Sequence, residues 1–130
     1  MTSLEKTTKT KVEDKMSVHR KKFSETEVKK VLGGTIRTFF TKETVGTEDL
    51  MFVMGDFEPG EGLDPHVHEA QEEVYYCVSG KGTVWYGEDK KETSIEPGIG
   101  LWIPRGVEHA VRNTGQEQLV IAFFLTPGRK

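Results

Sequence analysis

The pattern of apolar and polar positions changes at about residue 34. Beyond it, short runs rich in Thr, Ile, Val, Phe, Tyr and Trp alternate with clusters of Gly, Pro, Asn and Asp, which is typical of β-strands separated by turns. Strands are predicted at residues 35–41, 50–57, 66–68, 73–79, 82–86, 92–95, 100–103, 109–113 and 119–125. No helix-length segment interrupts them, so we expect an all-β protein whose antiparallel sheet closes into a jelly-roll barrel.

One segment upstream of these strands has helical periodicity. Ser24 and Glu27 have the spacing of a capping box, and the apolar residues at 28, 31 and 32 then share one helical face. The sequence therefore predicts a short helix over about residues 25–32, which the glycine pair that follows would end.

Composition and length narrow the class of protein. A chain of 130 residues with 35% hydrophobic and 30% charged residues fits one globular domain. The longest apolar stretch, residues 119–125, is far shorter than the ~20 residues that span a bilayer, so no membrane partner is expected. Residues 1–22 lack apolar periodicity, which predicts a flexible basic tail followed by a single domain over residues 23–130. They also lack a secretory pattern, which predicts a cytoplasmic location. The single Cys77 excludes an internal disulfide and agrees with a reducing compartment.

The net charge of −3 is divided unevenly along the chain. Residues 1–22 carry seven Lys or Arg against three Asp or Glu, so the remaining residues sum to −7. An acidic body repels a phosphate backbone, and no aromatic residue is interleaved with the basic tail. We therefore expect no nucleic acid partner.

Three of the four histidines stand beside turn residues in the predicted barrel. His66 and His68 would project from the same side of one strand, because successive side chains point to opposite faces. Glu72 or Glu73 could bring a carboxylate to the same point from the next strand, and His109 could supply a fourth ligand. Three imidazoles and a carboxylate suit divalent Mn, Fe, Co, Ni, Cu or Zn, and the lack of thiolates argues against a closed structural zinc site.

Two segments resemble the paired sequence motifs of the cupin superfamily. The positions that match the motifs are Gly60, His66, His68, Glu73 and Gly80 in the first, and Gly98, Pro104, Gly106, His109 and Asn113 in the second. The six-residue step to Gly80 favours Glu73 over Glu72. The resemblance extends over about residues 34–127 and implies a double-stranded β-helix that binds one divalent metal ion through His66, His68, Glu73 and His109. Asn113 is interpreted as a turn residue.

The resemblance also implies a function class. A metal-dependent cupin suggests an enzyme that acts on a small organic molecule by dioxygenase, decarboxylase, lyase or isomerase chemistry. The alternative is a non-catalytic module that binds or senses a small molecule. Mn(II) is ranked first and Fe(II) second, with Ni(II) or Zn(II) as occupants of recombinant protein. A homodimer is expected by analogy with other small cupins.

Several further side chains are candidates for the cavity around the metal. Alternation from Glu73 turns Tyr75 and Cys77 inward. Tyr75 could donate a proton or a hydrogen bond to a substrate, or equally fill the core, whereas Cys77 is expected to be a small buried hydrophobe. An inward Arg37 could select a carboxylate, although solvation at a strand edge explains it equally well. The many aromatic residues suggest an apolar pocket, though most would belong to the core.

Overall fold

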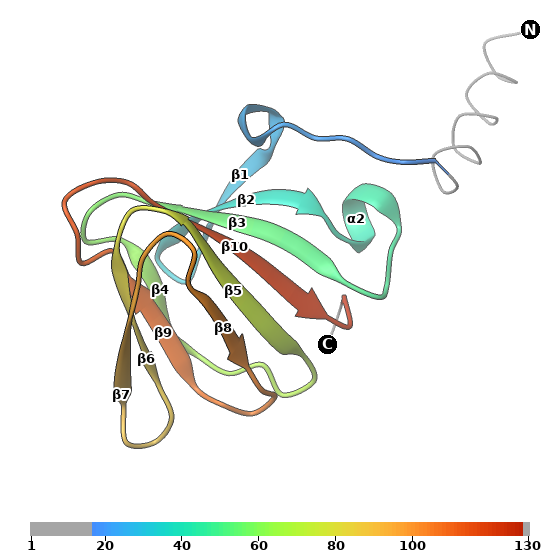
Figure 1. Cartoon of the computed structure of the whole chain (residues 1–130). Coiled ribbons are helices and arrows are strands. Elements are labelled where there is room, and N and C mark those ends of the chain that lie inside the picture. Colours follow the sequence, from blue (N-terminus) through green and yellow to red (C-terminus); the bar gives the residue numbers. More distant parts are fainter. Residues whose placement is uncertain (1–16, 129–130) are drawn as a thin grey trace, which may run out of the picture.

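The computed structural model describes residues 17–128, in which two antiparallel sheets face each other (Figure 1). The larger sheet has the order β1 (Glu27–Val31), β2 (Gly34–Phe40), β3 (Met51–Phe57), β10 (Leu119–Thr126), β5 (Glu72–Ser79) and β8 (Gly100–Ile103). The smaller sheet has the order β4 (Gly62–His66), β9 (His109–Arg112), β6 (Gly82–Tyr86) and β7 (Lys91–Ile95). The predicted all-β jelly roll is confirmed.

The core lies between the two sheets and follows the alternation of each strand. Residues with no exposed surface come from both sheets, among them Phe57, Val111, Leu119 and Ile121. Burial of each such side chain stabilises the fold by roughly 1.5–3 kcal/mol. In β5, Tyr75 is buried as predicted, while the residues on the opposite face of this strand are exposed.

The predicted helix over residues 25–32 is wrong, because residues 27–31 form β1. A single 3-10 turn, η1 (Phe23–Glu25), precedes the strand, and β1 pairs antiparallel with β2. Leu32 and Gly33 connect the two strands with φ angles of 51° and 88°, the left-handed conformations that match the twist of a tight hairpin. The five residues of β1 are exposed, so side-chain burial contributes little here, and the strand is stabilised by its backbone ladder with β2.

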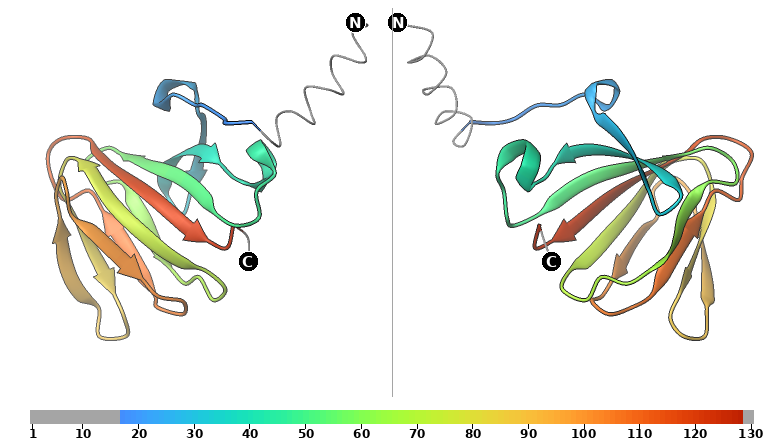
Figure 2. Two further views of the ribbon diagram at one scale, coloured as in Figure 1. Left: turned by 45° about the vertical axis from the view of Figure 1, so that its right-hand side comes forward. Right: turned by 180° about the vertical axis from the view of Figure 1, so that it is seen from behind.

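The one α-helix of the described residues is α2 (Lys42–Val45), which the sequence did not predict. It is a single turn capped by Thr41, which accepts a hydrogen bond from the Thr44 N–H, and it ends at Gly46 in the left-handed conformation. In Figure 2 this turn (green) lies at the end of β2 (cyan). Within residues 17–128, no helix is long and apolar enough to cross a membrane.

The predicted basic tail falls almost entirely outside the described residues, since residues 1–16 are not among them. Residues 17–22 contain neither helix nor strand. The division into a tail at 1–22 and a domain at 23–130 stays a prediction.

Arg37 lies on the outer face of the larger sheet, so its proposed role in selecting a substrate carboxylate is wrong. Its Nε donates to Asp56 Oδ2 at 2.8 Å, and its Nη1 donates to the Phe23 carbonyl oxygen at 3.2 Å. The guanidinium also lies 4.3 Å from the centre of the Phe23 ring, within the range of a cation–π contact. Arg37 therefore holds the N-terminal turn against the sheet.

Candidate metal centre

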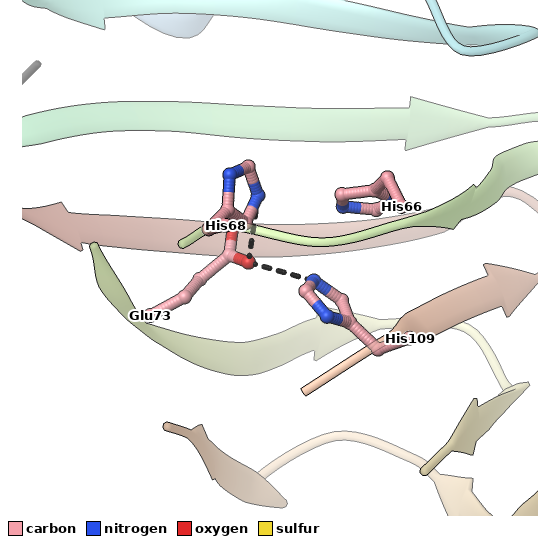
Figure 3. Close-up of side chains that lie close together, drawn as sticks. All are labelled: His66, His68, Glu73 and His109. Carbon is pink, nitrogen blue, oxygen red and sulfur yellow. Dashed lines mark hydrogen bonds and ion pairs between the residues drawn. The ribbon is translucent and has the colours of Figure 1, made fainter. Parts of the chain in front are cut away.

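Four side chains converge between the two sheets (Figure 3). His66, His68, Glu73 and His109 each offer one ligand atom, and these atoms all lie within 4.8 Å of one another. His66 ends β4, His68 follows it on a loop, Glu73 lies near the start of β5, and His109 begins β9. The structure thus brings together all four residues that the sequence suggested as metal ligands.

A β-bulge in β4 turns His66 inward. Leu63 pairs with Val111 and His66 pairs with His109, so three steps along β4 match two along β9. Leu63 is buried in the core, and strict alternation from it would turn His66 outward; the extra residue restores the inward direction. Pro65 lies within the bulge, where its missing N–H costs no ladder bond. The strand predicted at residues 66–68 is therefore misplaced, because β4 ends at His66.

The loop that carries His68 is held by the second motif. The Gly106 N–H donates to the His68 carbonyl oxygen at 3.0 Å. Gly106 has a φ angle of 80°, which a residue with a side chain adopts only at a cost. The turn after Pro104 therefore positions a ligand of the first motif.

Backbone carbonyls orient two of the three imidazoles. His66 Nδ1 lies 2.7 Å from the Asp64 oxygen, and His109 Nδ1 lies 2.9 Å from the Val107 oxygen. Since a carbonyl oxygen only accepts, each Nδ1 carries the proton and each Nε2 keeps its lone pair. This is the arrangement that metal-ligating histidines use to set ring orientation and tautomer.

Glu73 is buried, with 4% of its surface exposed. Its Oε1 lies 3.0 Å from His109 Nε2 and 3.5 Å from His68 Nε2. Burial raises the pKa of this carboxyl group above its ordinary value, and the neighbouring His109 side chain partly opposes the rise. Lone pairs of imidazole and carboxylate that face one another repel unless a proton or a cation lies among them. The donor set therefore fits a divalent metal ion.

The neighbouring Glu72 lies on the opposite face of β5 and does not join the cluster. Trp102 Nε1 donates to Glu72 Oε1 at 2.9 Å, and Arg105 Nη1 donates to Oε2 at 3.1 Å. The parity of the strand thus separates the two carboxylates, in agreement with the motif spacing that favoured Glu73.

Asn113 acts as a turn residue, as interpreted from the sequence. Its Nδ2 donates to the carbonyl oxygens of Phe57 at 2.9 Å and Glu117 at 2.8 Å, and its Oδ1 accepts from the Gly115 N–H. The side chain therefore ties the turn between β9 and β10 to the end of β3.

A cavity of about 380 Å³ opens beside the cluster. His66, His68 and Glu73 line one end of it, and the apolar lining residues include Ile36, Met51, Val53, Leu63, Phe123 and Leu125. The expected apolar pocket is present, and among the described residues that line it Phe123 is the only Phe, Tyr or Trp. Phe124 and Trp102 lie instead on the outer face of the larger sheet, 42% and 65% exposed.

The residues that line the far wall of this cavity were not among those predicted from the sequence. Glu27 and Lys29 from β1 line it, together with Thr41 and Glu43 at the start of α2. The sequence of β1, Glu-Val-Lys-Lys-Val, does not alternate as a half-buried strand would, and its apolar residues fit a helical spacing, so the local pattern gave no signal for this wall.

Tyr75 lies behind the cluster and does not line the cavity. It is 1% exposed, and its ring centre lies 5.9 Å from that of His109 and 4.5 Å from that of Phe123. Its buried hydroxyl has no hydrogen-bond partner in the described part of the protein. Burial raises the pKa of Tyr75 well above its ordinary value, and the nearby Glu73 adds to the rise. A catalytic role for Tyr75 therefore stays a prediction.

We expect Tyr75→Phe to bind as much metal as the wild type and to be equally stable or about 1 kcal/mol more stable, because the substitution removes a buried hydroxyl without a partner. Urea unfolding and metal analysis measure the two quantities. A clear loss of stability would show that the hydroxyl is hydrogen-bonded in solution. Loss of turnover at unchanged metal content would indicate that it serves the reaction.

Comparison with known proteins agrees with the fold. Residues 53–125 match the family model of the cupin domain. The Streptomyces cyaneus protein named polyketide synthase CurC is 32% identical over 114 residues, which are 88% of this chain and 73% of that protein. Protein SchB of Streptomyces halstedii is 33% identical over 95 residues, which are 73% of this chain and 67% of that protein.

A solved structure shows the same fold. The crystal structure of a predicted oxalate decarboxylase from Thermotoga maritima has a TM-score of 0.73 and 22% identity, and the match covers 84% of this chain and 99% of that one. A jelly roll of two facing sheets with three histidines and a glutamate between them is an all-β barrel with a candidate metal site. The chain belongs to the cupin family.

Proposed function

We propose that this protein is a metal-dependent cytoplasmic enzyme that acts on a small organic molecule. The observation that carries the proposal is the convergence of His66, His68, Glu73 and His109 at one end of an apolar cavity. Four protein ligands leave coordination positions open on an octahedral ion. As the bound metal we rank Mn(II) first and Fe(II) second. When bound, the metal supplies Lewis-acid or redox chemistry to an oxygen-bearing group of the substrate.

The cavity favours a substrate with a mainly apolar carbon skeleton. Its volume of about 380 Å³ lies in the range of cavities that hold whole organic ligands, so a two-carbon diacid would leave most of its apolar wall without contact. Polyketide intermediates combine an apolar skeleton with ketone and enol oxygens, and two relatives carry polyketide synthase in their names. We propose a substrate of this kind, bound to the metal through an oxygen.

A non-catalytic binding or sensing module is the second candidate, and one observation favours it. Among the described residues that line the cavity, the ionisable groups other than the metal ligands are Glu27, Lys29 and Glu43, which come from β1 and α2. General acid or base catalysis beside the metal would therefore depend on the ligands themselves or on water.

Metal analysis combined with turnover tests the proposal. Untagged protein purified without chelator would be analysed for bound metal and then incubated with a panel of aromatic β-diketones and dicarboxylates. Oxygen consumption and product mass would be recorded. We expect about one Mn or Fe per chain and turnover that Glu73→Gln abolishes. One metal per chain without turnover, with ligand binding retained in Glu73→Gln, would favour the binding module.

We also propose that the protein forms a homodimer through the outer face of the larger sheet. Phe124 pairs with Phe52 on one side and Val74 on the other, and Val74 pairs with Trp102. This apolar row crosses four adjacent strands, and three of its members are at least 40% exposed. Exposed apolar patches of this kind mark contact surfaces.

We expect Phe124→Glu to convert the dimer into a monomer, because a carboxylate would be buried without a partner at the centre of the row. Sedimentation velocity at micromolar concentration measures the change. Tyr86→Glu, a substitution at a similarly exposed residue (38%) on the smaller sheet, is expected to leave the dimer intact. A wild-type protein that sediments as a monomer would contradict the proposed dimer.

A further inference from the structure

The cavity extends along the inner face of the larger sheet from the metal cluster to β1. Strand pairing gives its course: Phe123 pairs with Val53, Val53 with Thr38, and Thr38 with Glu27. Glu73 lies on β5, the neighbour of β10 on the other side. Four strand spacings of about 4.8 Å separate β5 from β1, a distance on the order of 19 Å along the sheet.

Among residues 17–128, those that line this course are charged only at its two ends. The metal cluster occupies one end, while Glu27 and Lys29 on β1 and Glu43 on α2 occupy the other. The side chains between them along the sheet are apolar apart from Thr38, and they include Ile36, Met51, Val53, Phe123 and Leu125. A ligand that fills the cavity would therefore bury an apolar body and present a polar group at each end.

Lys29 is the only cation among the described residues that line the cavity. Its Nζ lies 3.9 Å from Glu27 Oε1, and the two side chains are 54% and 67% exposed. An ion pair this long and this exposed contributes little to stability. An anionic group of a ligand would therefore compete for the Lys29 ammonium with Glu27 and with Glu43, whose carboxylate Lys29 also attracts.

The next residue along β1 has the same chemistry and a different environment. Lys30 Nζ lies 2.8 Å from Glu61 Oε2 and 2.7 Å from Thr35 Oγ1, and it is not among the residues that line the cavity. Lys30 therefore provides a matched control for Lys29.

The backbone that carries Lys29 is held at both ends of β1. The Asp64 N–H donates to the Leu32 carbonyl oxygen at 2.9 Å, which joins the hairpin turn to β4. Arg37 holds Phe23 at the other end through the contacts described above. The β1–β2 hairpin thus forms a wall of the cavity that is held in place at both ends.

We propose that Lys29 selects substrates that carry an acidic oxygen group, a carboxylate or an ionised enol or phenol, at the end remote from the metal. This inference rests on the proposed function, since it requires an organic ligand bound at the metal. The substrate class becomes an elongated apolar molecule with one oxygen group for the metal ion and a second, anionic group for the Lys29 ammonium.

Linear diacids of increasing length test the inference. Co(II)-loaded full-length protein would be titrated with the series from octanedioic to hexadecanedioic acid and with the monocarboxylic acid of each length. Calorimetry gives the affinities, and the visible Co(II) absorption reports whether a carboxylate reaches the metal. We expect the diacid to bind roughly fivefold more tightly than the monoacid at a preferred length. Lys29→Gln should abolish this difference, and Lys30→Gln should retain it.

The outcomes separate this inference from the proposed function. Equal affinity of diacid and monoacid at every length, with a changed Co(II) spectrum, would overturn the role of Lys29 and leave ligand binding at the metal supported. The same loss of preference in Lys29→Gln and Lys30→Gln would also overturn it, because a general surface charge would then explain the effect. An unchanged spectrum and no measurable binding of any acid would overturn the proposed function, and the role of Lys29 with it.

Discussion

His109→Ala is expected to lower the affinity for the metal ion by at least about a hundredfold, since changes to residues that only support a ligand already cost 10–100-fold. His109 is 2% exposed, its Nδ1 is held by the Val107 oxygen, and its Nε2 faces Glu73. The alanine variant would leave the Glu73 carboxylate beside an empty space in the core. Elemental analysis of wild type and variant, after dialysis against the same buffered metal, measures the loss.

Thermal unfolding provides a second measure of the same loss. A metal ion that binds only the folded state adds about 2.7 kcal/mol of stability when its concentration is a hundred times its Kd. We therefore expect a chelator to lower the Tm of the wild type and to leave the Tm of His109→Ala unchanged. His19→Ala, which removes a histidine outside the cluster, should behave as the wild type does. Unchanged metal content in His109→Ala would contradict the assignment of the site.

The residues of the site were predictable because they follow motif spacing and strand parity. Motif spacing selected Glu73 over Glu72, and the inward direction of Tyr75 then follows from Glu73 by alternation along a regular strand. The inward direction of His66 does not follow in this way. It depends on the bulge at Asp64 and Pro65. The His-x-His spacing and the family motif both selected the right residue, although the strand assumed over residues 66–68 was misplaced.

The N-terminal hairpin was not predictable from local pattern. Ser24 and Glu27 satisfy the spacing of a capping box, but the apolar residues of the segment that follows, at 28, 31 and 32, are exposed and contribute little burial. Its structure is decided by pairing with β2, which lies beyond a turn that places Leu32 at a positive φ angle, an uncommon conformation for such a side chain. The pairing gives β1 its position on the cavity, so the wrong local prediction also concealed Lys29.

Gly62→Ala is expected to destabilise the protein by at least about 3 kcal/mol, beyond the usual cost of a single substitution. A Cβ atom at residue 62 would overlap the carbonyl oxygen of Val111 and lie 2.7 Å from the Arg112 Cα. Backbone atoms of β9 cannot move aside as a flexible side chain can, so β4 and β9 would have to separate. The same pairing places His66 opposite His109, and metal affinity should fall together with stability.

Gly60→Ala is the matched control for this prediction, two residues earlier in the chain. Gly60 has a φ angle of 89°, and a Cβ atom there would meet nothing within 4 Å, so the cost is confined to backbone strain of about 1–2 kcal/mol. Urea unfolding with excess chelator compares the variants without the contribution of the metal. If Gly62→Ala were as stable as Gly60→Ala or more stable, the close approach of β4 to β9 could not be the feature that sets the geometry of the metal site. If Gly62→Ala lost stability but kept wild-type metal affinity, the ligands would be positioned by their loops and not by the β4–β9 pairing.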